Sequence, residues 1–144
     1  MTDTYFCIPG DPVGKGRPRA FIRNKHVGMY TPKKTVNYEA LVKMMASQSH
    51  KGEPFLGPVF VEIHAYFSIP LSMKKTDREL AEKEYLPVLK KPDADNIVKA
   101  ICDAMNGVVY RDDAQVCDLT VRKRYSKNPR VIVIVNDQSK RIVI

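Results

Sequence analysis

Two aspartates stand two residues apart in the stretch KKPDADN, residues 90–96. Carboxylates this close repel each other, and a cation bound between them would relieve that repulsion. The residue before a proline favours extended backbone, and in an extended segment residues two apart point the same way, so Asp93 and Asp95 can face one site. Asp95 or Asn96 is a good N-cap for the following helix, and the structural alternative is that one aspartate caps the helix and the other is solvated.

Further charged residues follow at helical spacing. Lys99 lies four residues after Asp95, and Asp103 lies four residues after Lys99, so the three share one helix face. The pair Asp112–Asp113 comes after the helix and just before a strand, where the chain could return to the helix start. A site built from these carboxylates would suit Mg²⁺ or Mn²⁺, which prefer oxygen ligands. Such an ion could generate a nucleophilic hydroxide or stabilise charge on a phosphate under attack.

The charge balance of the whole chain is strongly basic. Among 144 residues there are 24 lysines and arginines against 16 acidic residues, a net charge of +8. This surplus favours polyanionic partners such as nucleic acids, and the alternative is a merely soluble basic surface. Residues 12–34 contain no acidic residue, and Lys15, Arg17 and Arg19 alternate there, so an extended backbone would present them as one cationic edge.

Hydrophobic spacing predicts the elements that position these residues. Helices are expected over residues 35–48 and 76–86. An apolar stripe from Ile97 to Val108 marks a third helix, and Asn106–Gly107 is its expected stop signal. The second helix is mostly polar, which favours a surface position or a projecting arm, and Thr76 and Glu79 have capping-box spacing. Strands are expected over residues 4–10, 58–70, 117–124 and 130–137.

The segment 12–34 is predicted to be a loop, and the apolar run of residues 130–137 is typical of a central strand. Together these elements predict one domain, residues 1–144, of the α/β (α+β) class, with a mixed sheet packed by two or three helices. The N-terminal stretch lacks the pattern of a signal peptide, and no cysteine belongs to a C-x-x-C pair. We therefore expect a soluble cytoplasmic protein without membrane contact, zinc knuckle or organic cofactor.

Residues 91–116, KPDADNIVKAICDAMNGVVYRDDAQV, closely resemble the motif of RusA-type Holliday junction resolvases. That motif reads D-x-D-N-x-x-K-x-x-x-D-A-L-x-G, followed by D-D-x-Q-V. The earlier stretch PVGKGRPRAF, residues 12–21, resembles the basic N-terminal motif of the Gram-positive and phage branch of that family. Met105 replaces the leucine of the pattern, a change that conserves volume.

The resemblance implies a small homodimeric, Mg²⁺-dependent endodeoxyribonuclease that nicks four-way DNA junctions symmetrically in recombination and repair, encoded by a bacterium or a prophage. Mn²⁺ is expected to substitute for Mg²⁺. By motif, Asp93, Asp95 and Asp113 match the catalytic, metal-binding carboxylates, and Lys99 matches the essential lysine. Three residues are expected to support them: Asn96, Asp103 and Asp112.

Contacts to the DNA backbone are assigned to the basic segment. Its expected contact residues are Lys15, Arg17, Arg19, Arg23 and Lys25, together with Lys33 and Lys34. Arg122 and Arg124 are further candidates for the same surface. The alternative for this segment is a solvated loop. Because two opposed cuts need two sites related by a two-fold axis, a homodimer is expected, with Phe60 and Tyr66 as candidate interface residues.

Other readings of the same residues stay open. The acids would equally serve a less selective Mg²⁺ nuclease acting on flaps or duplex DNA, or hold a structural ion in a non-catalytic DNA-binding module. Lys99 could form a simple ion pair with Asp95 or Asp103. A lone histidine on a strand, His64, is expected to be a hydrogen-bonded structural residue.

Overall fold

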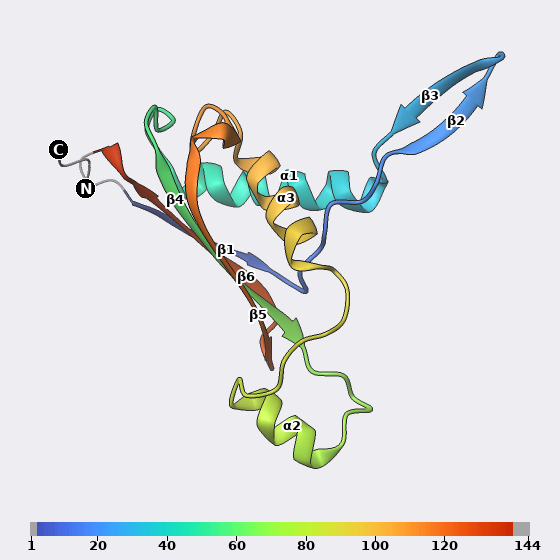
Figure 1. Cartoon of the computed structure of the whole chain (residues 1–144), viewed down its shortest axis with the longest axis vertical. Coiled ribbons are helices and arrows are strands. Elements are labelled where there is room, and N and C mark those ends of the chain that lie inside the picture. The colour runs from blue at the N-terminus through green and yellow to red at the C-terminus, as the bar shows by residue number, and fades with distance from the viewer. Residues whose placement is uncertain (1–2, 140–144) are drawn as a thin grey trace.

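The computed structural model describes residues 3–139, in which helices pack on one face of a four-stranded sheet (Figure 1). This confirms the predicted α/β fold with a mixed sheet. In chain order the elements are β1 (Thr4–Pro9), β2 (Arg19–Arg23), β3 (His26–Tyr30), α1 (Lys33–Ser49), β4 (Val59–Ser68), α2 (Lys75–Glu82), α3 (Ala94–Met105), the short 3₁₀ turn η1 (Asp113–Gln115), β5 (Val116–Ser126) and β6 (Arg130–Asp137).

The main sheet has the strand order β1-β6-β4-β5. Strand β6 pairs antiparallel with both β1 and β4, so the prediction that its apolar run is a central strand is confirmed. Strands β4 and β5 are parallel, because the chain between them crosses back over the sheet and includes α3. Burial alternates strictly along β4, where Val59, Val61 and Ile63 are fully buried and the residues between them are half-buried.

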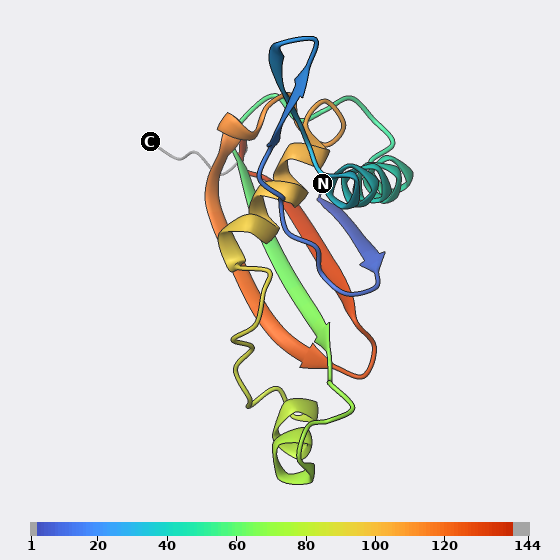
Figure 2. The same cartoon turned by 90° about the vertical axis from the view of Figure 1, so that its right-hand side faces the viewer.

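Helices α1 and α3 lie against one face of this sheet, as Figure 2 shows. Helix α3 buries Ile97, Ile101 and Met105 completely, as its predicted stripe requires. Each such side chain contributes about 2 kcal/mol on burial, so the helix is held in one rotation about its axis. The opposite side of α3, which carries its charged residues, therefore faces outward.

Two arms project from the body of the protein (Figure 1). One is the ribbon β2–β3, which forms a separate two-stranded sheet. The prediction that residues 12–34 are a loop is therefore wrong over residues 19–30. Asn24 and Lys25 adopt positive φ of 51° and 64°, the backbone of a tight two-residue hairpin turn whose twist matches that of the paired strands.

The other arm contains α2, and it confirms the expected projecting polar helix. The predicted capping box at Thr76 and Glu79 is wrong, because the helix begins after Lys74 and no side chain caps it. The turn before the helix is held instead by Arg78, whose guanidinium donates to the carbonyls of Pro70 and Leu71 at 3.0 Å each. No helix in residues 3–139 is long and apolar enough to cross a membrane.

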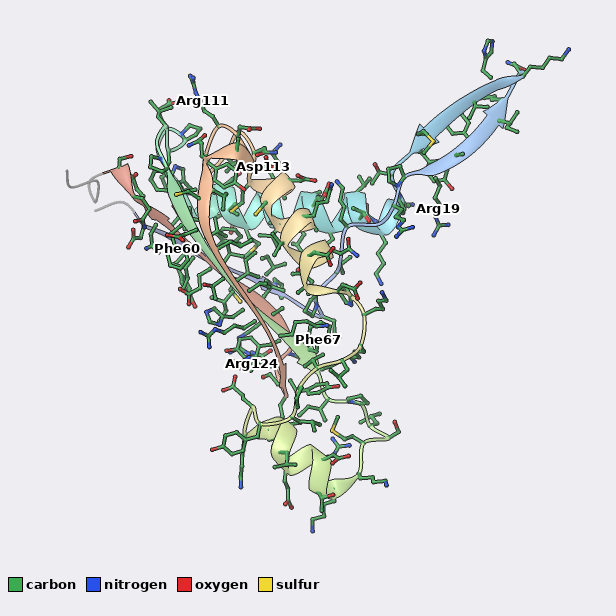
Figure 3. The ribbon with its side chains drawn as sticks, in the orientation of Figure 1. Arg19, Phe60, Phe67, Arg111, Asp113 and Arg124 are labelled. Atoms are coloured by element: carbon green, nitrogen blue, oxygen red, sulfur yellow. The ribbon has the colours of Figure 1, made fainter. Side chains whose placement is uncertain are left out.

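The second face of the main sheet is left without a helix by the described residues (Figure 3). Its β4 residues, among them Phe60, His64 and Tyr66, are half-buried. The prediction for His64 is confirmed, since its Nε2 lies 2.6 Å from the Glu62 carboxylate. The Arg130 guanidinium stacks over the Tyr66 ring at 4.2 Å from its centroid.

Candidate active site

The first turn of α3 presents two carboxylates without using either as a cap. Asp93 is the N-cap residue by backbone position, so the prediction that Asp95 or Asn96 holds that position is wrong. The Asp93 side chain makes no capping bond and pairs instead with the Lys91 ammonium at 3.0 Å. Asp95 is exposed one residue inside the helix, where the positive end of the helix dipole favours its negative charge.

A charged stripe, defined here as Asp95, Lys99 and Asp103, runs along the outward face of α3. A helix rises 1.5 Å per residue, so Asp95 and Asp103 are separated by about 12 Å along the axis. Lys99 is exposed, and within residues 3–139 it forms no ion pair with Asp95 or Asp103. The simple ion-pair reading of Lys99 therefore has no support in this geometry.

The turn η1 fixes the position of Asp113. The Asp112 carboxylate accepts from the Ala114 N–H at 3.0 Å, and Gln115 Oε1 accepts from the Asp112 N–H at 3.0 Å, which together form a capping box. Gln115 Nε2 also donates to the carbonyls of Phe55 and Gly57, at 2.8 and 2.9 Å. Asp112 and Gln115 thus build the turn, and the D-x-x-Q spacing was the sequence signal for it.

Asp113 lies beside the last turn of α3 (labelled in Figure 3), so the expected return of this acid to the helix start is wrong. The pKa of its carboxyl is raised, first by burial, then by a hydrogen bond with Asp103 and by the charges of Asp112 and Asp103. A hydrogen bond from Asn106 partly opposes this rise. Two carboxylates, Asp103 and Asp113, therefore crowd together at this end of the stripe.

A hollow of about 330 Å³ joins these acids to the lysine. Lys99, Asp103 and Asp113 all line it, and Val98, Cys102 and Leu119 supply apolar walls. Burial raises the pKa of the Cys102 thiol to about 11, so at neutral pH the free thiol is uncharged. Tyr110 is buried and donates its hydroxyl to the Cys102 carbonyl at 2.8 Å, which ties the chain after α3 to the helix.

Lys15 enters this acidic cluster from the basic segment. Its ammonium lies 2.7 Å from the Glu39 carboxylate of α1 and 3.3 Å from that of Asp103. Burial lowers the pKa of Lys15, but the hydrogen bonds and charges of Glu39 and Asp103 outweigh it and leave the pKa raised. Sequence reasoning grouped Lys15 with Arg17 and Arg19 and missed Glu39, because no local pattern shows which α1 residue faces α3.

Backbone contacts dock the start of the basic segment onto α3. The Lys15 N–H donates to the Asn96 carbonyl at 2.9 Å. A Cβ added at Gly14 would lie 2.7 Å from the Pro92 Cβ, so only glycine permits this close approach. The Gly16 N–H donates to the buried Thr35 hydroxyl at 2.8 Å. The two segments that resemble one family are therefore in direct contact.

Beside this contact lies a second hollow, of about 520 Å³, with a cationic rim. Arg17, Arg19, Lys34 and Lys91 line it, and Asn96 of α3 borders it. Arg17 and Arg19 are exposed, and Figure 3 shows Arg19 at the root of the ribbon. The expected cationic edge is thus present next to the first turn of α3. Lys15 also lines this hollow, but its ammonium is paired with Glu39 and Asp103.

Two of the expected contact residues lie elsewhere. Arg122 and Arg124 pair in register with His64 and Tyr66, and so belong to the face of the sheet opposite α3 (Arg124 in Figure 3). Their predicted place on the same surface as the basic segment is wrong. A one-residue step along a strand changes the face, and the sequence does not show which face the helix covers.

The predicted acids do not form one compact cluster. Asp93 and Asp95 belong to the first turn of α3, whereas Asp113 joins Asp103 near the last. Within residues 3–139, no three histidine, cysteine, aspartate or glutamate side chains are grouped closely enough to hold a metal ion by themselves. Among the described residues, the structure assembles a carboxylate pair with Lys99 beside it and unpaired.

Comparison with known proteins adds two findings. Residues 9–136 match the family model of the endodeoxyribonuclease RusA, a range that includes both the basic segment and the charged stripe. A similar chain is the uncharacterized protein YqaN of Bacillus subtilis strain 168, which is 42% identical over 136 residues. That alignment covers 93% of this chain and 96% of its relative.

Proposed function

Because the chain belongs to the RusA endodeoxyribonuclease family, we propose that it is a Mg²⁺-dependent endonuclease that resolves four-way DNA junctions by paired symmetric nicks. One observation carries the proposal beyond the family. The carboxylate pair and Lys99 share one hollow, and an acid-free basic segment is docked against the same helix. Groups able to hold a metal thus stand next to groups able to hold DNA phosphates.

The residues fit magnesium by their chemistry. Proteins hold Mg²⁺ through one or two carboxylates, with water and substrate phosphate completing the shell. Asp103 and Asp113 form such a pair, and a cation bound between them would offset the burial and mutual repulsion that raise the pKa of Asp113. We assign Asp113 and Asp103 to one end of the metal-binding surface, and Asp93 and Asp95 to the other. A bound Mg²⁺, or Mn²⁺ in its place, would activate water and neutralise charge on the phosphate.

The remaining groups act on the substrate. Lys99 lies between the two pairs of acids and has no internal partner among the described residues, so its ammonium is free to hold the scissile phosphate as charge develops. Lys15 acts as a positioning residue, because it ties Asp103 to Glu39. Arg17, Arg19, Arg23, Lys25, Lys33 and Lys34 are proposed to hold phosphates flanking the cut.

Two opposed nicks require two such sites. A homodimer with a two-fold axis supplies them, and the half-buried sheet face with Phe60 and Tyr66 is the surface we propose for it. Sedimentation of the protein alone tests this part. A monomer that stays a monomer on a junction would contradict it.

Cleavage of a labelled mobile four-way junction and of a matched linear duplex tests the function itself. Wild-type protein with Mg²⁺ should nick opposed strands of the junction and spare the duplex, and EDTA or Asp95→Asn should abolish nicking while junction binding remains. Equal cutting of both substrates would leave a nuclease without junction selectivity. Binding without any cutting would point to a DNA-binding module.

A further inference from the structure

The ribbon β2–β3 has two chemically different faces. Side chains alternate along a strand and paired residues share a face, so the register assigns each residue to one side. One side carries Arg19, Phe21, Arg23, His26 and Tyr30. The other side, called here the apolar side, consists of Ala20, Ile22, Val27 and Met29.

The apolar side is exposed to an unusual degree. Ile22 is 78% exposed, Val27 72% and Met29 63%, although each belongs to a residue type that is normally buried. The ribbon stands clear of the helices and the main sheet, which meet it only at its root (Figures 1 and 2). A row of large apolar side chains held away from the core is a surface for something other than folding.

The ribbon is also built to keep its shape. The Phe21 ring covers Gly28, where an added side chain would overlap it, and Phe21 lies against Tyr30 with ring centroids 6.1 Å apart. The turn at Asn24 and Lys25 fixes the pairing register. The apolar side is therefore presented in a defined form before any partner is bound.

Charge indicates which partner the ribbon fits. The basic segment of residues 12–34, of which the ribbon is the projecting part, has seven lysines and arginines and no acid, so the ribbon suits a polyanion. In a nucleic acid, the surface available for apolar contact is that of the bases. Aliphatic side chains such as Ile and Met are inserted between base steps by proteins that open a stack.

We propose that the ribbon is a wedge: the apolar side of Ile22, Val27 and Met29 inserts against unstacked bases at the branch point of a DNA junction. This inference rests on the proposed function and names how the junction would be distinguished from duplex DNA. Unstacking a continuous duplex costs a few kcal/mol per step, whereas at a branch point the stack is already interrupted. A wedge therefore avoids at the junction the unstacking cost that it would meet on the duplex.

The reach of the ribbon suits this role. Five residues per strand give a length of roughly 17 Å, which equals about five base-pair steps. Its root carries Arg19 on the rim of the cationic hollow beside α3. One junction arm can therefore contact the charged stripe while the branch point contacts the apolar side.

The test uses 2-aminopurine placed at the branch point of a four-way junction, with a matched duplex and EDTA to prevent cutting. The double variant Ile22→Thr/Val27→Thr keeps strand propensity but removes apolar surface. Leu71→Thr/Leu89→Thr is the matched control, because these leucines of the α2 arm are 97% and 91% exposed. Met29→Thr is an independent third variant of the apolar side.

Wild type should raise 2-aminopurine emission on the junction, and the double variant should lose most of that rise. Its preference for the junction over the duplex should fall about tenfold, the scale of one lost side chain–base contact, with duplex affinity unchanged. The leucine control should behave as wild type. Retained emission and preference in both apolar-side variants, while wild type still cuts junctions, would overturn the wedge alone.

Two other outcomes would overturn it differently. A wild type that shows no preference for the junction and no cutting would remove the proposed function and the wedge together. A double variant that sediments as a smaller assembly than wild type would show that the apolar side joins copies of this chain, and the wedge would again be excluded.

Discussion

The outward face of α3 and the basic segment of residues 12–34 are neighbours held in place by different means. The α3 stripe is backed by Ile97, Ile101 and Met105, which are fully buried. The backbone positions from which its charged side chains extend are therefore fixed. The basic segment rests on a few contacts at residues 14–16 and then leaves the body as the ribbon. Chemistry requires positions held within about half an ångström, whereas phosphate binding requires mainly charge.

Lys15 shows that this division does not follow chain order. By sequence it belongs to the alternating basic residues, but by contact it belongs to the acids, at 2.7 Å from Glu39 and 3.3 Å from Asp103. Arg17, only two residues later, is exposed on the rim of the cationic hollow. Substitutions on the two sides of this boundary should therefore affect different measurements.

The largest effect is expected from the acids of the α3 face. Asp113→Asn and Asp95→Asn should each lower junction cleavage on the order of 10³-fold, because a bound cation contributes several kcal/mol of charge stabilisation. Junction binding should stay or tighten as negative charge is removed. Single-turnover cleavage alongside gel-shift binding measures both, with Glu79→Gln, an exposed carboxylate of the α2 arm, as control. Cleavage retained in both variants would remove the metal-binding assignment.

A smaller loss is expected from Lys99→Ala. Removing one charge-stabilising donor costs about 10²-fold in rate. Because Lys99 is exposed and unpaired among the described residues, the melting temperature should not change. Thermal unfolding and single-turnover rates measured on the same samples test this, with the exposed Lys43→Ala of α1 as control. A loss below tenfold would return Lys99 to an ordinary surface role.

The boundary at Lys15 gives the third prediction. Arg17→Ala/Arg19→Ala should lower the slope of log affinity against log salt by about 1.8, from two lost phosphate contacts at about 0.9 each. Lys15→Ala should leave that slope nearly unchanged and instead lower the cleavage rate about tenfold, because Asp103 loses the group that positions it. Titrations at several salt concentrations separate the two effects. Equal slope changes in both variants would show that Lys15 contacts DNA as well.

The same contrast explains how far the sequence could predict the structure. The helix and strand periods were read correctly for α3, β4 and β6, because each buries one regular set of side chains. The ribbon was missed because its apolar residues are not buried, so its alternation of Arg and apolar residues looked like loop composition. Residue type alone makes the acids candidates, but the distances between them depend on where η1 docks, and long-range contacts such as Gln115 to Phe55 set that position.

The smallest predicted effect concerns stability, and it follows from the crowding of Asp103 and Asp113. The pKa of Asp113 is raised above its ordinary value of 3.8, chiefly by burial and by the hydrogen bond with Asp103. The folded state therefore binds this proton more tightly than the unfolded state, and ionised Asp113 destabilises the fold at pH 7. Below pH 3.8 both states are protonated and the penalty disappears.

Asp113→Asn keeps a hydrogen-bonding side chain without the charge, so in EDTA it should melt above wild type at pH 7. Solvent screens a half-buried carboxylate, and the expected gain is about 1–2 °C. The gain should shrink as the pH falls through the raised pKa of Asp113 toward its ordinary range. Calorimetry at pH 7 and pH 4 measures it. A variant that melts below wild type at pH 7 would mean that the two carboxylates do not repel, and that the pair is not held ready for a cation.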